Sequence, residues 1–284
     1  MLNWNRVDLT FACIAALQKV RDAIEDLVVV DNGSTDESVL RLRGIPGVTL
    51  LEVGKNLGYA GGNNVGIRYA MQDGADYLWV LNNDVDPEEN SLRGLVEAVS
   101  GDESIGAAAS AQFMASTNES YPAAVDVSDR GEVAITCPGC SHGFHRADVL
   151  KGPSLLLNAV ALREVGLFDE EYFHYYEDVD LMERLARRGW RRGLACHSRV
   201  RHIGGGSLAR ESAAAHYYFT RNRLLFRRKL YGDHPFTTIL RRPRYAAEAL
   251  QVRRSVRARD KERFVAGFRG IVDAIRRRTG PGTP

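Results

Sequence analysis

The chain has 284 residues, of which 44% are hydrophobic and 26% charged, and its formal net charge is +2. These proportions exclude disordered, fibrous and disulfide-stapled classes and predict a globular chain with one large core, alone or with an appendage. Four scattered cysteines fit a reducing compartment, and no apolar run approaches the ~20 residues that span a bilayer. Because the first residues also lack a signal-peptide pattern, the sequence predicts a cytoplasmic protein.

The first 81 residues alternate predicted helices with predicted strands. The helices are expected at 8–24, 36–42 and 62–72, and the strands at 27–30, 48–53 and 77–81. Because parallel strands need crossover connections, this alternation predicts an α/β fold with a mostly parallel central sheet flanked by helices.

Polar residues follow two of these strands. Asp31 comes directly after the first, and Asn82-Asn83-Asp84 comes directly after the third. Ligands of such sheets gather beyond the carboxyl ends of the strands. We therefore expect the two segments to lie close together in the folded chain.

The pattern is weaker in the rest of the chain. Residues 100–151 predict short strands and loops, whereas helical periodicity returns at 163–190 and 213–231. The last segment, 244–278, predicts a basic amphipathic helix or helix pair. Arginines cover one of its faces, and the other carries Phe264, Phe268, Ile271, Val272 and Ile275. We predict a catalytic domain over residues 1–230 and a helical extension over 231–284.

Three segments carry side chains suited to chemistry, and each also has a purely structural explanation. Asn82-Asn83-Asp84 offers oxygen ligands for Mg²⁺ or Mn²⁺, although Asn and Asp are also the usual residues of turns. Asp178, with Glu177 and Asp180 nearby, stands among aromatic residues ahead of a helix, where it acts either as a proton acceptor or as a cap. His202, before a glycine run, is either a metal ligand or a structural histidine.

Six motifs follow one another along the chain. They are Val29-Val30-Asp31-Asn32-Gly33-Ser34-Thr35-Asp36, Asn56-Leu57-Gly58-Tyr59-Ala60-Gly61-Gly62-Asn63-Asn64-Val65-Gly66, Leu81-Asn82-Asn83-Asp84, Gly166-Leu167-Phe168-Asp169-Glu170, Tyr176-Glu177-Asp178-Val179-Asp180-Leu181, and His202 with Gly204 to Ser207. Their order resembles that of the family 2 inverting glycosyltransferases, whose fold is called GT-A. The resemblance extends from about Leu2 to about Leu230. The sequence is similar in particular to the bacterial rhamnosyltransferase branch of this family, in which Asn-Asn-Asp often replaces Asp-x-Asp.

The resemblance implies a donor pocket made by five of these residues. It implies that Asp31 contacts the base or ribose of the nucleotide and that Asn56 and Asn63 line the same pocket. Asn82 is expected near the ribose or the donor sugar, with Asn83 beside it in the same motif.

The resemblance also implies the residues that carry out the reaction. Asp84 binds Mg²⁺ or Mn²⁺, His202 joins the metal or diphosphate site, and Arg221 meets phosphate. Asp178 is the base, with Glu177 nearby. The divalent ion neutralises the diphosphate leaving group while the base takes the proton of the acceptor hydroxyl, and this direct displacement inverts the anomeric centre.

The predicted function is transfer of a sugar from a nucleotide diphosphate sugar to a saccharide, lipid-linked or small-molecule hydroxyl acceptor in cell-surface polysaccharide or glycoconjugate biosynthesis. dTDP-rhamnose is the first expected donor, and UDP-hexoses come next. One alternative is a sugar nucleotidyltransferase, for which residues 30–36 lack the expected glycine-rich basic loop. Another is a catalytically impaired nucleotide-sugar-binding homologue. That alternative arises because Met1–Asn5 resembles only the end of the family's first strand, which we expect to be truncated.

Two features lie outside the resemblance. Cys137 and Cys140 have the spacing of half a zinc site, although a loop near the acceptor is the favoured interpretation. The basic C-terminal helix lacks nucleic-acid motifs, so no nucleic-acid partner is expected. It predicts either a peripheral contact with the inner membrane face or packing on the catalytic core through Phe264 and Phe268.

Overall fold

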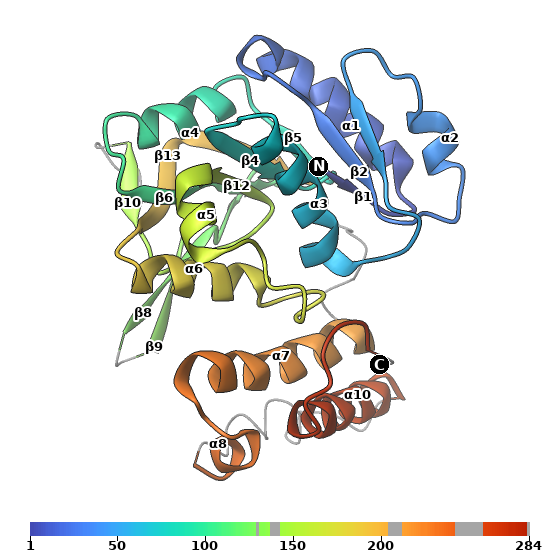
Figure 1. Ribbon diagram of the computed structural model, residues 1–284, viewed down its shortest axis with the longest axis vertical. Helices are drawn as coiled ribbons and strands as arrows, with labels where there is room; N and C mark the ends of the chain where they lie inside the picture. The colour runs from blue at the N-terminus through green and yellow to red at the C-terminus, as the bar shows by residue number, and fades with distance from the viewer. Residues whose placement is uncertain (129–130, 137–142, 204–211, 242–257, 283–284) are drawn as a thin grey trace. The chain divides into compact units, whose positions relative to one another are not determined.

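The computed structural model describes residues 1–128, 131–136, 143–203, 212–241 and 258–282 (Figure 1). Cys137, Cys140 and the glycine run at 204–207 lie outside the described residues. The chain forms two compact units. The first comprises Met1–Leu57, Gly61–Phe168 and Asp178–Gly205, and the second comprises Gly58–Ala60, Asp169–Glu177 and Gly206–Pro284. The boundaries of these units differ from the one expected after residue 230. The division into a catalytic domain and a helical extension at that residue stays a prediction.

The first unit begins with a small parallel sheet. Its strands are β1 (Leu2–Asn3), β2 (Val28–Asp31) and β3 (Thr49–Glu52), and its helical segments are α1 (Val7–Leu17), η1 (Gln18–Ala23) and α2 (Ser38–Leu42). The expected helix over 8–24 changes to a 3₁₀-helix after Leu17, and Val20 inside that segment has non-helical backbone angles. β1 is two residues long.

A larger sheet forms the centre of the first unit, in the order β10-β13-β6-β12-β4. Its strands are β4 (Tyr77–Leu81), β6 (Ile105–Met114), β10 (Phe144–Arg146), β12 (Ser154–Asn158) and β13 (Arg191–His202), and β5 (Val85–Pro87) and β7 (Ser120–Tyr121) pair at its margins. β6 and β13 are parallel, but β12 runs antiparallel to both of its neighbours. A parallel bridge between Leu2 and Asn82 connects this sheet to the smaller one.

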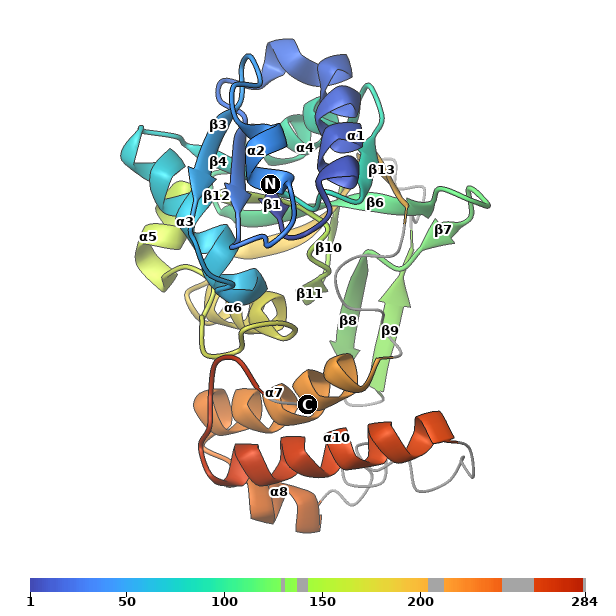
Figure 2. The same ribbon diagram turned by 90° about the vertical axis from the view of Figure 1, so that its right-hand side faces the viewer.

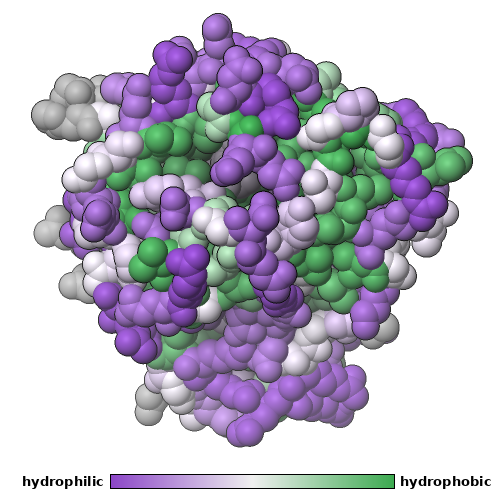
Figure 3. Space-filling view, turned by 45° about the horizontal axis from the view of Figure 1, so that its top comes forward, coloured by the Kyte–Doolittle hydropathy of each residue, from purple (hydrophilic) through white to green (hydrophobic). Residues whose placement is uncertain are grey.

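Helices and a third sheet complete the first unit. The helices are α3 (Gly58–Gln72, whose first turn belongs to the second unit), α4 (Ser91–Val99), α5 (Ala159–Val165) and α6 (Glu177–Arg187), and the third sheet contains β8 (Ala124–Ser128), β9 (Gly131–Ile135) and β11 (Val149–Leu150). α4 packs against β13 and β6. In Figure 3, hydrophilic side chains surround smaller hydrophobic areas of the surface.

The second unit contains α7 (Ala213–Tyr231), α8 (Pro235–Arg241) and α10 (Ala258–Ile275), and α10 packs along α7 (Figure 2). The face of α10 that is buried carries small residues, namely Ala266, Gly267, Gly270 and Ala274. Phe264 and Phe268 are 46% and 54% exposed. The alternative in which these two phenylalanines anchor the helix by packing is therefore wrong. The small residues form the contact instead, because they let the backbones of α7 and α10 approach. Among the described residues, no helix is long and apolar enough to cross a membrane.

Candidate active site

The carboxylate of Asp31 is buried at the end of β2, where three donors hold it. Ser34 donates its backbone N–H to Oδ1 at 2.9 Å and its hydroxyl to Oδ2 at 2.6 Å. Asn3 Nδ2, at the end of β1, donates to Oδ2 at 2.8 Å. Asp31 therefore uses much of its accepting capacity to shape the turn after β2. Its contact with a base or ribose stays a prediction.

A line of hydrogen bonds connects Asp31 with the Asn82-Asn83-Asp84 segment. The hydroxyl of Thr10 donates to Asn3 Oδ1 at 2.7 Å and accepts from Asn83 Nδ2 at 3.0 Å. The two segments that were expected to lie close together are thus joined through two buried side chains. Neither Asn3 nor Thr10 belongs to a motif, so the sequence analysis missed both.

Asp84 and His202 lie side by side because β5 pairs with the end of β13. The register places His202 opposite Val85, and the N–H of Ile203 donates to the carbonyl of Asp84 at 2.9 Å. His202 Nε2 lies 3.2 Å from Asp84 Oδ2. The two residues predicted to share a metal site are therefore in contact.

The second carboxylate oxygen of Asp84 shows that the pair fits a cation. Asp84 is 3% exposed, and among the described residues its Oδ1 has no hydrogen-bond partner. Such an atom destabilises a folded protein unless a cation or donor reaches it. A carboxylate oxygen beside an imidazole nitrogen suits Mn²⁺ or Mg²⁺. Within the described ranges no group of three His, Cys, Asp or Glu side chains forms a metal site, so diphosphate oxygens would have to supply further ligands.

The residues predicted to line the nucleotide pocket lie around the start of α3. Asn32 Nδ2 donates to Asn56 Oδ1 at 3.1 Å, and Asn63 on α3 is buried. A Cβ atom at Gly62 would lie 2.5 Å from the end of the Leu2 side chain, so α3 approaches β1 closely at this glycine. The structure thus brings Asn56 and Asn63 to the helix that packs on the first sheet, and their contacts with a nucleotide stay predictions.

Asp178 lies in the first turn of α6, and the start of β12 brings it toward the Asn82-Asn83-Asp84 segment. The N–H of Val179 donates to Asp178 Oδ1 at 2.8 Å, and the N–H of Gly152 also donates to this carboxylate. The next residue, Pro153, accepts a hydrogen bond from the N–H of Asn82 at 3.0 Å. One short segment of chain therefore contacts both predicted catalytic motifs.

Burial raises the pKa of Asp178 above its usual range, and it outweighs the backbone hydrogen bonds and the charge of Lys151, which lower that pKa. A raised pKa makes this carboxylate a stronger base. Lys151 Nζ also lies 5.4 Å from the ring centre of Tyr121, which stacks on His202 with ring centres 6.4 Å apart. Lys151 therefore places a positive charge near Asp178, and it contacts the aromatic ring that stacks on His202. The sequence analysis missed it because residues 100–151 contain no recognised motif.

The two acids next to Asp178 differ in their surroundings. Glu177 is buried at the start of α6, and its role near the base stays a prediction. Asp180 Oδ2 forms an ion pair with Arg184 Nε at 2.6 Å. Arg184 in turn donates to the carbonyl of Val165 at 2.6 Å. Asp180 is therefore a structural residue that fixes the chain ahead of α6.

In the second unit, the loop of residues 172–176 leads directly into α6. Its backbone has positive φ values, between 65° and 76°, at Phe173, Tyr175 and Tyr176. Such angles cost roughly 1 kcal/mol or more each and persist only where neighbours impose them. Asn222 Nδ2 of α7 lies 2.7–2.9 Å from three carbonyl oxygens of this loop, and the N–H of Tyr59 donates to the carbonyl of Phe173 at 2.7 Å. These contacts hold the loop in this conformation.

Arg221 does not have the surroundings expected of a phosphate ligand. It is 1% exposed, and its Nη1 donates to the carbonyl of Gly280 at 2.6 Å. Its Nη2 donates to the carbonyl of Tyr172 at 2.8 Å, and its Nε to Asn222 Oδ1 at 2.9 Å. Because these donors are directed at protein oxygen atoms, Arg221 anchors the C-terminal segment and the 172–176 loop. Its contact with phosphate stays a prediction.

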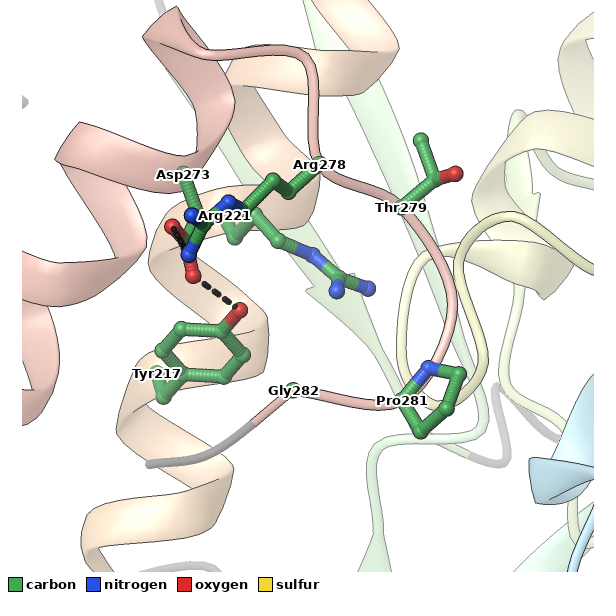
Figure 4. Close-up of a pocket in the computed structure, with 7 residues that line it drawn as sticks. All are labelled: Tyr217, Arg221, Asp273, Arg278, Thr279, Pro281 and Gly282. Atoms are coloured by element: carbon green, nitrogen blue, oxygen red, sulfur yellow. Dashed lines mark hydrogen bonds and ion pairs between the residues drawn. The ribbon is translucent and has the colours of Figure 1, made fainter.

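A pocket in the second unit is lined by residues of α7, α10 and the C-terminal segment (Figure 4). Tyr217 donates its hydroxyl to Asp273 at 2.8 Å, and burial followed by this hydrogen bond raises the pKa of Tyr217 to about 12. Of the predicted site residues, Arg221 alone lines this pocket. The pocket is therefore distinct from the Asp84–His202 site in the first unit.

Comparison with solved structures shows the fold. The fold is similar to that of the mannosyltransferase PcManGT from Pyrobaculum calidifontis in complex with GDP-Man and Mn²⁺, with a TM-score of 0.59, 15% identity, and coverage of 100% of this chain and 74% of that one. It is also similar to GalNAc-T7 with UDP, GalNAc and Mn²⁺, with a TM-score of 0.57 and 12% identity over 84% of this chain and 52% of that one. The predicted GT-A glycosyltransferase fold is confirmed.

Sequence comparison shows what the chain is similar to. Residues 2–130 match the model of Glycosyl transferase family 2. The chain is 29% identical, over 89% of its length and 92% of the relative's, to an N-acetylglucosaminyl-diphospho-decaprenol L-rhamnosyltransferase from Mycobacterium tuberculosis. It is 26% identical, over 58% of its length and 54% of the relative's, to the low-salt glycan biosynthesis hexosyltransferase Agl10 from Haloferax volcanii. The predicted resemblance to family 2 glycosyltransferases, and to rhamnosyltransferases among them, is confirmed.

Proposed function

We propose that the protein is an inverting, metal-dependent glycosyltransferase that moves a sugar from a nucleotide diphosphate sugar to a hydroxyl of a glycan or lipid-linked acceptor. The observation that carries the proposal is the contact of Asp84 with His202, which leaves one buried carboxylate oxygen available to a cation. The name of the mycobacterial relative supports dTDP-rhamnose as the first donor to test and a lipid-linked acceptor. UDP-hexoses are the next donors.

The proposed mechanism assigns separate tasks to residues of the first unit. Asp84 and His202 would hold Mn²⁺ or Mg²⁺, which supplies electrostatic stabilisation of the diphosphate leaving group when bound. Lys151 would place its positive charge near Asp178. Asp178 accepts the proton of the acceptor hydroxyl as that oxygen attacks the anomeric carbon. A single displacement of this kind inverts the anomeric configuration.

The donor and metal should stabilise the folded protein together. We expect dTDP-rhamnose or a UDP-hexose with Mn²⁺, at ~100 times its Kd, to raise the melting temperature by about 5 °C, because a ligand of the native state alone contributes ~2.7 kcal/mol at that concentration. EDTA should remove most of the shift, because the diphosphate then loses its cation. A thermal-shift panel of nucleotide sugars with and without Mn²⁺ measures this. No shift with any nucleotide sugar would contradict the proposed function.

The location and membrane contact of the protein form a further part of the proposal. We place the protein in the cytoplasm, peripheral to the inner membrane face. On α10, the exposed apolar residues Phe264, Phe268 and Ile275 follow one another at helical spacing. The exposed basic residue Lys261 lies on the same helix, and the exposed Arg276 directly follows it. An apolar stripe beside positive charge fits the headgroup region of an anionic bilayer.

Vesicle sedimentation tests this contact. The intact protein should bind vesicles containing phosphatidylglycerol and bind pure phosphatidylcholine vesicles at least ~5-fold more weakly, because the basic residues contribute about 1 kcal/mol each near an anionic surface. Phe264→Ser with Phe268→Ser should reduce binding to the anionic vesicles. Leu40→Ser is the matched control, because Leu40 is 75% exposed on α2. Equal binding of the intact protein to both vesicle types would remove the membrane contact from the proposal. Wild-type binding of the double variant to the anionic vesicles would remove it as well.

A further inference from the structure

We infer that Tyr121 is a positioning residue of the proposed metal site. Its ring holds the imidazole of His202 beside Asp84 and so strengthens the binding of Mn²⁺ or Mg²⁺. The inference rests on the proposed function, and it deepens that function by adding a residue that acts on the metal through His202. Tyr121 belongs to none of the sequence motifs and lies on β7, at the margin of the central sheet.

The imidazole of His202 lacks the hydrogen bond that usually orients a metal-binding histidine. One ring nitrogen, Nε2, lies 3.2 Å from Asp84 Oδ2. The other ring nitrogen of such a histidine normally donates to a carboxylate or carbonyl oxygen, and this hydrogen bond fixes the ring. In the part of the chain that the structure describes, Nδ1 of His202 has no hydrogen-bond partner. A contact of another kind is therefore needed to limit the rotation of the ring.

The ring of Tyr121 supplies such a contact. Its centre lies 6.4 Å from the centre of the His202 ring, with 24° between the two planes, and aromatic rings attract one another at this separation. The Tyr121 ring is itself held, because Lys151 Nζ lies 5.4 Å from its centre, within the range of a cation–π contact. Tyr121 therefore offers His202 a half-buried surface whose own position is restricted.

The backbone places both rings on the same face of the sheet. β6 lies between β7 and β13 (Figure 2). On one side of β6, Tyr121 lies opposite Gln112, and on the other side His202 lies opposite Met114. Gln112 and Met114 are two residues apart on one strand, so they and their partners share a face. The N–H of Ala115, directly after β6, also donates to the carbonyl of His202 at 3.1 Å.

Tyr121→Leu tests the inference, because leucine fills part of the space of the ring but cannot stack on an imidazole. Calorimetric titration with Mn²⁺, in the presence of UDP or dTDP, measures the metal affinity. We expect about 10-fold weaker binding of Mn²⁺, which is the usual effect of removing a neighbour that orients a metal-bound histidine. Tyr121→Phe keeps the ring, so it should bind Mn²⁺ within ~2-fold of the wild type.

Phe113→Leu is the matched control, because it also removes an aromatic ring from this margin of the sheet. Phe113 pairs with Ser120, the residue before Tyr121, and its ring lies 4.1 Å from the guanidinium carbon of Arg199. It follows Gln112 on β6, so its side chain points to the opposite face from His202. Phe113 is 7% exposed. Its substitution should lower the melting temperature of the metal-free protein and leave the affinity for Mn²⁺ unchanged, and an equal loss of that affinity would overturn the inference.

A double-mutant cycle separates an effect through His202 from general damage. In a His202→Ala background, Tyr121→Leu should change the Kd for Mn²⁺ less than ~2-fold, because no imidazole is left to hold. Wild-type affinity in Tyr121→Leu would overturn the inference, as would full additivity in the double variant. If Tyr121→Leu does not fold, Tyr121→Val, which suits a strand, takes its place with the same expected result. A wild-type protein that binds no Mn²⁺, or unchanged binding by His202→Ala, contradicts the proposed metal site instead.

Discussion

Asp178→Asn should reduce sugar transfer by a factor of about 10²–10⁴, the usual contribution of a general base, while the donor still binds. The substitution keeps the size of the side chain and its hydrogen bond from Val179, and it removes the proton acceptor. Transfer is measured with dTDP-rhamnose and a polyprenyl diphosphate sugar acceptor, and donor binding by calorimetry. The matched control is Glu183→Gln on the same helix, because Glu183 forms an exposed ion pair with Arg187 and should be dispensable for transfer. Transfer by Asp178→Asn within ~3-fold of the wild type would assign the base elsewhere.

The pH profile gives this prediction a second measurement. The base must be deprotonated to work, so kcat/KM should fall on the acid side as the pH drops through the pKa of Asp178, which burial raises. The positive charge of Lys151 lowers that pKa. Lys151→Gln should therefore raise the pKa and move the acid limb to higher pH. An acid limb that stays in place in Lys151→Gln would show that another group controls it.

Asp84→Asn should abolish metal-dependent donor binding and reduce transfer by at least ~10²-fold, because an amide is a weaker ligand for a divalent cation than a carboxylate. Calorimetric titration with Mn²⁺ in the presence of nucleoside diphosphate measures the binding. The variant should remain folded in the absence of metal. The substitution removes a buried charge, and it breaks no hydrogen bond of Oδ1, because this atom has no partner among the described residues.

Asp86 offers the control for Asp84 because it stands two residues further along the same strand-end segment. It forms a half-exposed ion pair with Lys19 at 2.9 Å, and such pairs contribute little. Asp86→Asn should therefore retain Mn²⁺ binding and transfer to within a few-fold. Equal losses in the two variants would indicate general damage to the segment. Retained metal binding in Asp84→Asn would contradict the assignment of the metal site.

The expected elements match the structure best where local pattern is strong. Helical spacing over 213–231 corresponds to α7, and the apolar run at 77–81 corresponds to β4. The sequence pattern failed at β6, whose residues Ile105–Met114 are buried on nearly every position and so show no alternation. On α10 the pattern left two alternatives open for the phenylalanine face, and the structure shows Phe264 and Phe268 exposed. There, tertiary packing favoured the small residues, because they allow two helices to lie closer together.

The sequence by itself determined the family resemblance and the chemical types at the site, because Asp, Asn and His at these spacings restrict the reactions that a chain can catalyse. Only the tertiary structure decided which side chains meet. Pairing of β5 with β13 brings His202 to Asp84, whereas the donors of Arg221 are directed at backbone carbonyls. It also showed Asn3 and Thr10 between Asp31 and Asn83. A motif records what a residue can do, but its partners depend on segments that are distant in the chain and adjacent only after folding.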